Sequence, residues 1–132
     1  MIEARPALDP ELAALVAAQQ HELRSAAFTP DDDATYLVAV VDGRAVACAA
    51  WRPTLDPGIA ELQRVYVRPA FRGRGIARQL IVWIEEETLA AGRSIIRLEA
   101  GPCSPAAQAL FQSSGYDQVD GAFVKRVVAL VP

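Results

Sequence analysis

The clearest pattern of hydrophobic and polar positions lies between residues 59 and 92 of the 132-residue chain. Apolar side chains from Ile59 to Val67 predict a buried or half-buried strand, although Gln63 and Arg64 break a strict alternation. Proline cannot donate to a ladder, so Pro69 ends the strand. Beyond a basic turn, apolar residues recur at helical spacing, and Gly92 is a candidate helix cap. The stripe that predicts a core-facing helix consists of Ile76, Ala77, Leu80, Ile81, Ile84, Thr88 and Ala91.

Turn-forming residues divide the rest of the chain into further elements. Asp42-Gly43 separates two β-prone runs at 35–41 and 44–51, which predicts an antiparallel hairpin. The strand at 59–67, the helix after it and a strand over 94–100 form a unit whose two strands pair in parallel. The other expected elements are a first strand over 2–7, a helix beginning at Asp9 and Pro10, loops over 25–34 and 52–58, a helix capped by Ser104, and a closing hairpin over 116–131.

These elements predict the fold class. We expect one domain over residues 1–132, because the chain is long enough for one core and too short for two. Its α/β fold should contain a mixed, mostly antiparallel sheet of six to seven strands, flanked by three to four helices.

Composition and charge restrict the partners. Hydrophobic residues make up 52% and charged residues 22% of the chain, as in globular proteins. The formal net charge of −3 argues against nucleic acid as the main partner. Basic side chains nevertheless gather between residues 64 and 78, which predicts a local pocket for an anion. They are Arg64, Arg68, Arg72, Arg74 and Arg78.

The two cysteines and the single histidine do not form a metal motif. Cys48 lies in an apolar run and is expected in the core, whereas Cys103 lies between prolines and is expected to be exposed. Two unpaired thiols fit a reducing cytoplasm. The first residues do not resemble a signal peptide and no apolar run has the length of a membrane span, so we expect a cytoplasmic protein.

The turn between the predicted strand and helix has the features of a phosphate site. In Arg72-Gly73-Arg74-Gly75-Ile76-Ala77, two glycines allow close backbone approach, and the first N–H groups of the helix carry the positive end of its dipole. The two arginines favour a diphosphate over a carboxylate. The alternative is an ordinary tight turn with solvated arginines. Arg78 stands where a dinucleotide fingerprint needs its third glycine, and no Gly-Lys-Ser/Thr sequence is present, which excludes both of those patterns.

This turn also resembles a family signature. Arg72 to Ala77 is similar to the Arg/Gln-x-x-Gly-x-Gly/Ala motif of the GNAT family of N-acetyltransferases, and residues 65–69, Val-Tyr-Val-Arg-Pro, resemble the usual approach to it. Residues 98–101, 107–111 and 115–116 are similar to later segments of the same family. Together the similar segments cover about residues 35–124 in family order.

The resemblance implies acetyl-coenzyme A (acetyl-CoA) as the acyl donor. Its pyrophosphate would bind the backbone N–H groups of the turn, and its pantetheine arm would extend along a strand edge, where unpaired N–H and C=O groups suit an amide chain. The residues thereby assigned to coenzyme A binding are Val65, Tyr66, Val67, Arg72, Gly73, Arg74, Gly75, Ile76, Ala77, Ser104 and Phe111.

The resemblance also assigns catalytic roles. Glu61 matches the general-base glutamate of histone-type members, and the alternative is a surface carboxylate paired with an arginine. Phe111 stands where many relatives carry a tyrosine that protonates the leaving thiolate, so this chain lacks that acid. Ser104 and Tyr116 are weaker substitutes, because a cap and a core position already explain them.

The acceptor is implied only as a class, a primary amine of a small molecule or peptide. Transfer would be direct, because no nucleophile and base pair is legible for a covalent intermediate. In the family, the segment that corresponds to Asp31, Asp32 and Asp33 lies beside the acceptor. These carboxylates either select a cationic amine or form a solvated turn. His21 is expected at the surface. The competing function is a non-catalytic acyl-CoA-binding or regulatory domain. Homodimers are common in the family, and the sequence does not define the oligomeric state.

Overall fold

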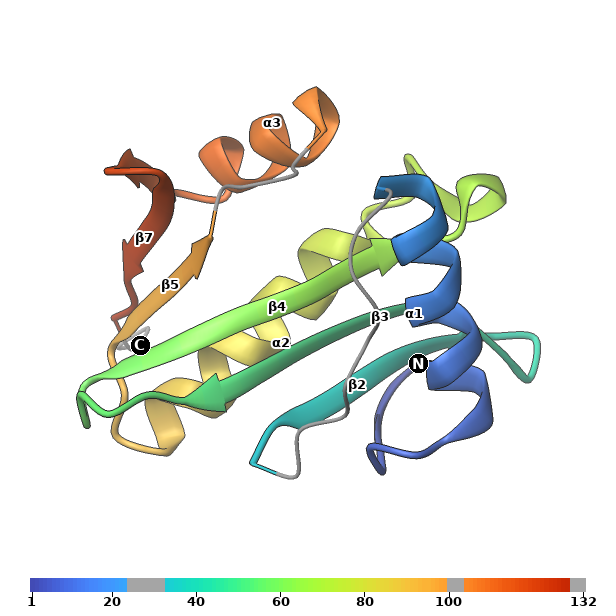
Figure 1. Ribbon diagram of the computed structural model, residues 1–132, viewed down its shortest axis with the longest axis horizontal. Helices are drawn as coiled ribbons and strands as arrows, with labels where there is room; N and C mark the ends of the chain where they lie inside the picture. Colours follow the sequence, from blue (N-terminus) through green and yellow to red (C-terminus); the bar gives the residue numbers. More distant parts are fainter. Residues whose placement is uncertain (24–32, 100–103, 129–132) are drawn as a thin grey trace.

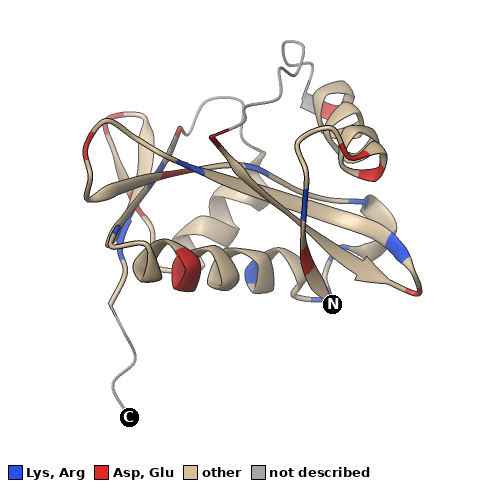
Figure 2. Cartoon of the chain, turned by 90° about the horizontal axis from the view of Figure 1, so that it is seen from below, with Lys and Arg blue, Asp and Glu red and all other residues tan. Residues whose placement is uncertain are grey.

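The computed structural model describes residues 1–23, 33–99 and 104–128, which form one seven-stranded sheet. The strand order is β1-β2-β3-β4-β5-β7-β6, and every neighbouring pair is antiparallel except β4 and β5. Helix α1 covers one face of the sheet, and α2 covers the other (Figures 1 and 2). The predicted fold class is confirmed.

The boundaries of the elements follow the local sequence signals. In chain order they are β1 (Ile2–Arg5), α1 (Pro10–Leu23), β2 (Thr35–Val41), β3 (Arg44–Pro53), β4 (Ile59–Val67), a 3₁₀ turn η1 (Pro69–Phe71), α2 (Ile76–Ala90), β5 (Ile95–Glu99), α3 (Pro105–Ser113), β6 (Asp117–Val119) and β7 (Ala122–Arg126). Asp9 caps α1 by accepting a 2.9 Å hydrogen bond from the Leu12 N–H, as predicted. Asp42 and Gly43 both have positive φ, which is the hairpin turn that their sequence indicates.

Several expected boundaries were wrong by a few residues. Strand β1 ends at Arg5, and β3 continues to Pro53 because Arg52 and Pro53 pair with β4 instead of starting a loop. Ala91 is exposed beyond the end of α2 and does not extend its buried stripe. Strand β7 ends at Arg126, and the last residues assigned to the closing hairpin lie outside the described residues.

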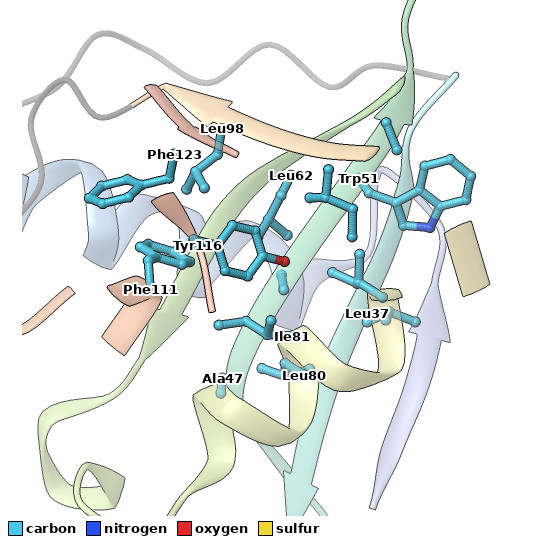
Figure 3. Packing of buried hydrophobic residues seen from close by; sticks show 14 of the residues in the cluster. Leu37, Ala47, Trp51, Leu62, Leu80, Ile81, Leu98, Phe111, Tyr116 and Phe123 are labelled. Atoms are coloured by element: carbon cyan, nitrogen blue, oxygen red, sulfur yellow. The ribbon is translucent and has the colours of Figure 1, made fainter. Parts of the chain in front are cut away.

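Two apolar clusters lie on the two faces of the sheet. The larger cluster joins the sheet to α2 and α3, and Figure 3 shows Leu80 and Ile81 of α2 pointing toward it together with Phe111 of α3. The smaller cluster joins α1 to the opposite face through residues such as Leu15, Val38 and Tyr66. Because successive strand residues point to opposite faces, the two clusters show which face each β4 side chain occupies.

Strand β4 contains a bulge that the sequence pattern only hints at. Cys48 pairs with Tyr66 and Ala50 pairs with Gln63, so Ala49 alone lies opposite both Arg64 and Val65. Arg64 has φ of +58°, which is unusual for a residue with a side chain. Gln63 and Arg64 break the apolar alternation at this point, and the bulge is the reason.

The two parallel strands separate beyond the first three residues of β4. Within the described residues, β4 pairs with β5 only from Ile59 to Glu61, whereas β4 itself continues to Val67. The edge of β4 that would face β5 is therefore open over its second half. This opening positions the site.

Candidate active site

A cleft of about 750 Å³ lies along the open edge of β4, between the start of α2 and the helix α3. Eleven of the twelve residues proposed from the sequence line it. They are Glu61, Val65, Tyr66, Val67, Arg72, Gly73, Gly75, Ile76, Ala77, Ser104 and Phe111. The fold thus brings strand, turn and helix residues up to 50 positions apart in the sequence to one concave surface.

The glycine turn presents unpaired backbone donors to this cleft. Gly73 and Gly75 have φ of +79° and +78°, and Gly75 is the residue that caps the start of α2. The first intrahelical bond runs from the Gln79 N–H to the Gly75 carbonyl at 3.1 Å, so the N–H groups of Ile76 and Ala77 have no acceptor within the helix. A Cβ at Gly73 or Gly75 would meet nothing within 4 Å. The open space in front of these donors fits a phosphate group.

The two arginines of the turn have different surroundings. Arg72 donates to both Glu22 carboxylate oxygens at 2.8 and 3.0 Å and to the Val67 carbonyl at 2.8 Å. The hydrogen bond that Arg72 donates to Glu22 is the main cause of the raised pKa of Arg72, which stays charged. Arg74 is the one proposed residue that does not line the cleft, and its guanidinium lies 5.0 Å from the Phe71 ring centroid.

Helix α3 forms the wall of the cleft opposite the start of α2. Ser104 caps it by accepting a 3.1 Å hydrogen bond from the Ala107 N–H, as its sequence position predicts. Phe111 is 3% exposed and packs edge-on to Tyr116, with ring centroids 5.8 Å apart (Figure 3). Apolar spacing predicts that Ala106, Ala107 and Leu110 also belong to the buried face of α3, but Ala106 is exposed in the cleft.

Tyr116 does not face the cleft and cannot replace a missing acid. Its hydroxyl donates to Glu85 Oε2 at 2.9 Å, and Lys125 Nζ lies 3.0 Å from Glu85 Oε1. Burial, together with the Glu85 charge and hydrogen bond, raises the pKa of Tyr116 well above its usual range. The hydroxyl is therefore occupied in a buried contact among α2, β7 and the segment before β6.

Glu61 lies on the α1 face of the sheet at the end of the paired part of β4. Its neighbours Ala60 and Leu62 belong to the cluster on the α2 face, so the Glu61 side chain points the other way. Arg52 Nη2 is 3.2 Å from Glu61 Oε2, and Arg97 is its register partner on β5. Glu61 therefore lines the cleft and also pairs with an arginine, as the alternative interpretation of a paired surface carboxylate predicts.

The sequence did not single out two cleft residues on α1. Gln19 and Glu22 are three positions apart, which places both on the helix face toward β4, and both line the cleft. Gln19 follows Leu12, Leu15 and Val16 at helical spacing, so the sequence pattern places it in the buried helix stripe. Their signal would have been a polar pair within an apolar stripe, which is visible only when the partner strand is known.

Two other candidate groups, Cys48 and His21, do not line the cleft. Burial raises the pKa of Cys48 to about 12, so its thiol stays protonated in the core as predicted, and His21 is exposed outside the cleft. Asp31, Asp32 and Cys103 lie outside the described residues. Across residues 1–23, 33–99 and 104–128, no three His, Cys, Asp or Glu side chains gather as a metal site. None of the helices in this part of the chain is long and apolar enough to cross a bilayer.

The fold and the cleft together define an α/β protein with a ligand cleft at an open strand edge. The model of the acetyltransferase (GNAT) family matches residues 4–116, and the chain belongs to this family. The resemblance seen in the sequence is confirmed.

Individual relatives agree with this assignment. The chain is 34% identical over 109 residues to an "IAA acetyltransferase" of Azospirillum brasilense, covering 83% of this chain and 71% of that one. A Klebsiella pneumoniae structure described provisionally as an acyl-CoA N-acyltransferase has a TM-score of 0.82 and 27% identity, with 97% of each chain covered. A GNAT acetyltransferase from Elizabethkingia anophelis, solved with acetyl-CoA bound, has a TM-score of 0.69 and 14% identity, with 96% of this chain and 97% of that chain covered. Family membership and such complexes support acetyl-CoA as the cosubstrate.

Proposed function

We propose that this protein is an N-acetyltransferase that transfers the acetyl group of acetyl-CoA directly to a primary amine of a small molecule or peptide. The observation that carries the proposal is one cleft that joins a glycine-capped helix start, an open strand edge and a carboxylate. Each of these supplies one requirement of the reaction: a phosphate site, a site for an amide arm, and a proton acceptor.

The backbone supplies most of the proposed coenzyme A binding. The free N–H groups at the start of α2 bind the pyrophosphate, assisted by the positive end of the helix dipole. The open edge at Val65, Tyr66 and Val67 pairs with the amide groups of the pantetheine arm. Ser104 and Phe111 form the wall on the α3 side. Arg72 contributes charge near the phosphates, although Glu22 holds its guanidinium.

The proposed role of Glu61 is that of general base. Acetyl-CoA supplies an activated acetyl thioester. A primary amine is protonated near neutral pH and must lose a proton before its nitrogen can form the new C–N bond as the C–S bond breaks. Glu61, directly or through a water, takes that proton. Family members described as N-acyltransferases support an amine over an alcohol as acceptor.

Replacement of Glu61 tests this role. Glu61→Gln keeps the size of the side chain and removes the basic oxygen, so kcat should fall by about 10²–10⁴ at neutral pH, the usual worth of general-base catalysis. Glu99 also lines the cleft and pairs with Arg97, which makes Glu99→Gln the matched control with kcat close to wild type. A Glu61→Gln enzyme with the full wild-type rate at every pH would remove Glu61 from the mechanism.

A non-catalytic acyl-CoA-binding protein is the second candidate. Two observations favour it: Glu61 is already paired with Arg52, and Phe111 has no hydroxyl to offer to a leaving thiolate. Coenzyme A release from acetyl-CoA, measured against a panel of primary amines, separates the two functions. An N-acetyltransferase releases coenzyme A in proportion to added amine, whereas a binding protein binds acetyl-CoA and releases none above background.

We also propose a cytoplasmic location, which the two unpaired cysteines of the sequence support.

A further inference from the structure

The two carbonyl groups of the β4 bulge are each held by a side chain from another element. Cys48 Sγ on β3 lies 3.4 Å from the Arg64 carbonyl, and Gln19 Nε2 on α1 donates to the Val65 carbonyl at 3.0 Å. Arg64 and Val65 both line the cleft. Both contacts come from the α1 face of the sheet, at the point where β4 borders the proposed coenzyme A site.

These contacts determine where the Val65 N–H points. In a trans peptide the C=O of one residue and the N–H of the next point in opposite directions. The Arg64 carbonyl points to the Cys48 thiol, so the Val65 N–H points away from that side chain, and Val65 lines the cleft. The raised pKa of Cys48 keeps its S–H available as a donor at neutral pH.

Gln19 is an unusual choice for the position it occupies. It is 8% exposed on the buried side of α1, next to the fully buried Leu15 and Val16. Its Nε2 faces the Val65 carbonyl, which fixes the amide orientation and leaves Oε1 buried without a partner among the described residues. An apolar side chain would avoid this unsatisfied oxygen. The amide is therefore explained by the carbonyl that it holds.

We infer that Gln19 and Cys48 are positioning residues, which hold the bulge so that the Val65 N–H donates to a carbonyl oxygen of the acyl-pantetheine arm. This inference rests on the proposed function, because it takes acetyl-CoA as the ligand of the cleft. Neither side chain needs to touch the reacting atoms. Loss of either contact lets the bulge peptides rotate, and the donor is then no longer directed into the cleft.

Two ligands with different reach test this inference. Acetyl-CoA contacts the bulge through its pantetheine arm, whereas ADP carries a diphosphate but no pantetheine and reaches only the glycine turn. For Gln19→Met we expect the Kd of acetyl-CoA to rise about three- to tenfold, the range of one hydrogen bond. The inhibition constant of ADP, measured in competition with acetyl-CoA, should change less than about twofold.

Cysteine variants and a control complete the test. Cys48→Ala removes the weaker donor and should raise the Kd of acetyl-CoA about two- to threefold, whereas Cys48→Ser keeps a donor and should restore most of that loss. Gln112→Met makes the same change as Gln19→Met at an exposed site outside the cleft and should leave both ligands unaffected.

Three results would overturn the inference. They are equal weakening of acetyl-CoA and ADP, unchanged acetyl-CoA affinity in Gln19→Met, and a Cys48→Ser variant no better than Cys48→Ala. A wild-type protein that binds no acetyl-CoA contradicts the proposed function itself, which keeps the two failures distinct.

Discussion

At the scale of single residues, Phe111 determines how complete the catalytic machinery is. The ring lines the cleft and packs against Tyr116 and Phe123, so it shapes the wall without offering a proton. A thiol with a pKa near 8.5 is a fair leaving group unaided, so this absence slows the proposed reaction without preventing it.

Phe111→Tyr tests this reasoning. The added hydroxyl should raise kcat on a good amine several-fold by protonating the thiolate, and the affinity for acetyl-CoA should stay nearly unchanged. Steady-state kinetics and calorimetry measure the two quantities. Phe71 also lines the cleft, near the glycine turn, and Phe71→Tyr is the control with unchanged kcat. A fall in kcat with the fold intact would mean that residue 111 does not approach the sulfur.

The sequence predicts single residues well where one local rule decides their conformation. Asp9 and Ser104 cap helices as their sequence positions predict, and Gly75, predicted to allow close backbone approach, adopts the left-handed region. Gln19 and Glu85 could not be predicted in the same way. Their partners, Val65 and Lys125, lie about 40 positions or more away, and only the completed fold brings each pair together.

At the scale of elements, α2 is connected to the end of the sheet through Glu85. This carboxylate is buried, accepts from Tyr116 and pairs with Lys125, whose ammonium also donates to the Ser114 carbonyl at 2.8 Å. A run of three glutamates near a helix end suggests that Glu85 and Glu86 are both solvated. Helical position separates them, because Glu85 follows Ile81 by one turn on the buried face.

Glu85→Ala and Glu86→Ala form a matched pair for this connection. Removal of Glu85 leaves the Tyr116 hydroxyl and Lys125 without their shared partner, so the free energy of unfolding should fall by about 2–3 kcal/mol. Removal of the exposed Glu86 should change it by less than about 0.5 kcal/mol. Urea denaturation measures both, and equal values for the two variants would contradict the structural role of Glu85.

The strands and helices themselves were predicted closely, and the bulge was not. Strand β4 begins and ends where apolar periodicity and Pro69 indicate, and α2 begins directly after Gly75. Periodicity reports which face a residue occupies but not how two strands diverge. The bulge that follows the last residue paired with β5 contains Arg64 at positive φ and is contacted by Cys48 and Gln19, and these contacts are tertiary.

At the scale of the whole molecule, the sheet creates the cleft by separating two parallel strands between helices on opposite faces. Helix α2 directs its N-terminus to this opening, and α1 places Gln19 and Glu22 on the other side. The central claim is that this cleft binds acetyl-CoA through the glycine turn. Acetyl-CoA binding can be tested without knowing the acceptor amine.

Coenzyme A affinity in two glycine variants tests that claim most directly. Gly75 and Gly92 lie at opposite ends of α2, have φ of +78° and +81°, and have nothing within 4 Å of an added Cβ. Gly75→Leu and Gly92→Leu should therefore lower the free energy of unfolding by a similar amount, about 1–2 kcal/mol. Calorimetry should show coenzyme A binding lost in Gly75→Leu and retained in Gly92→Leu. Wild-type affinity in a folded Gly75→Leu protein would contradict the account.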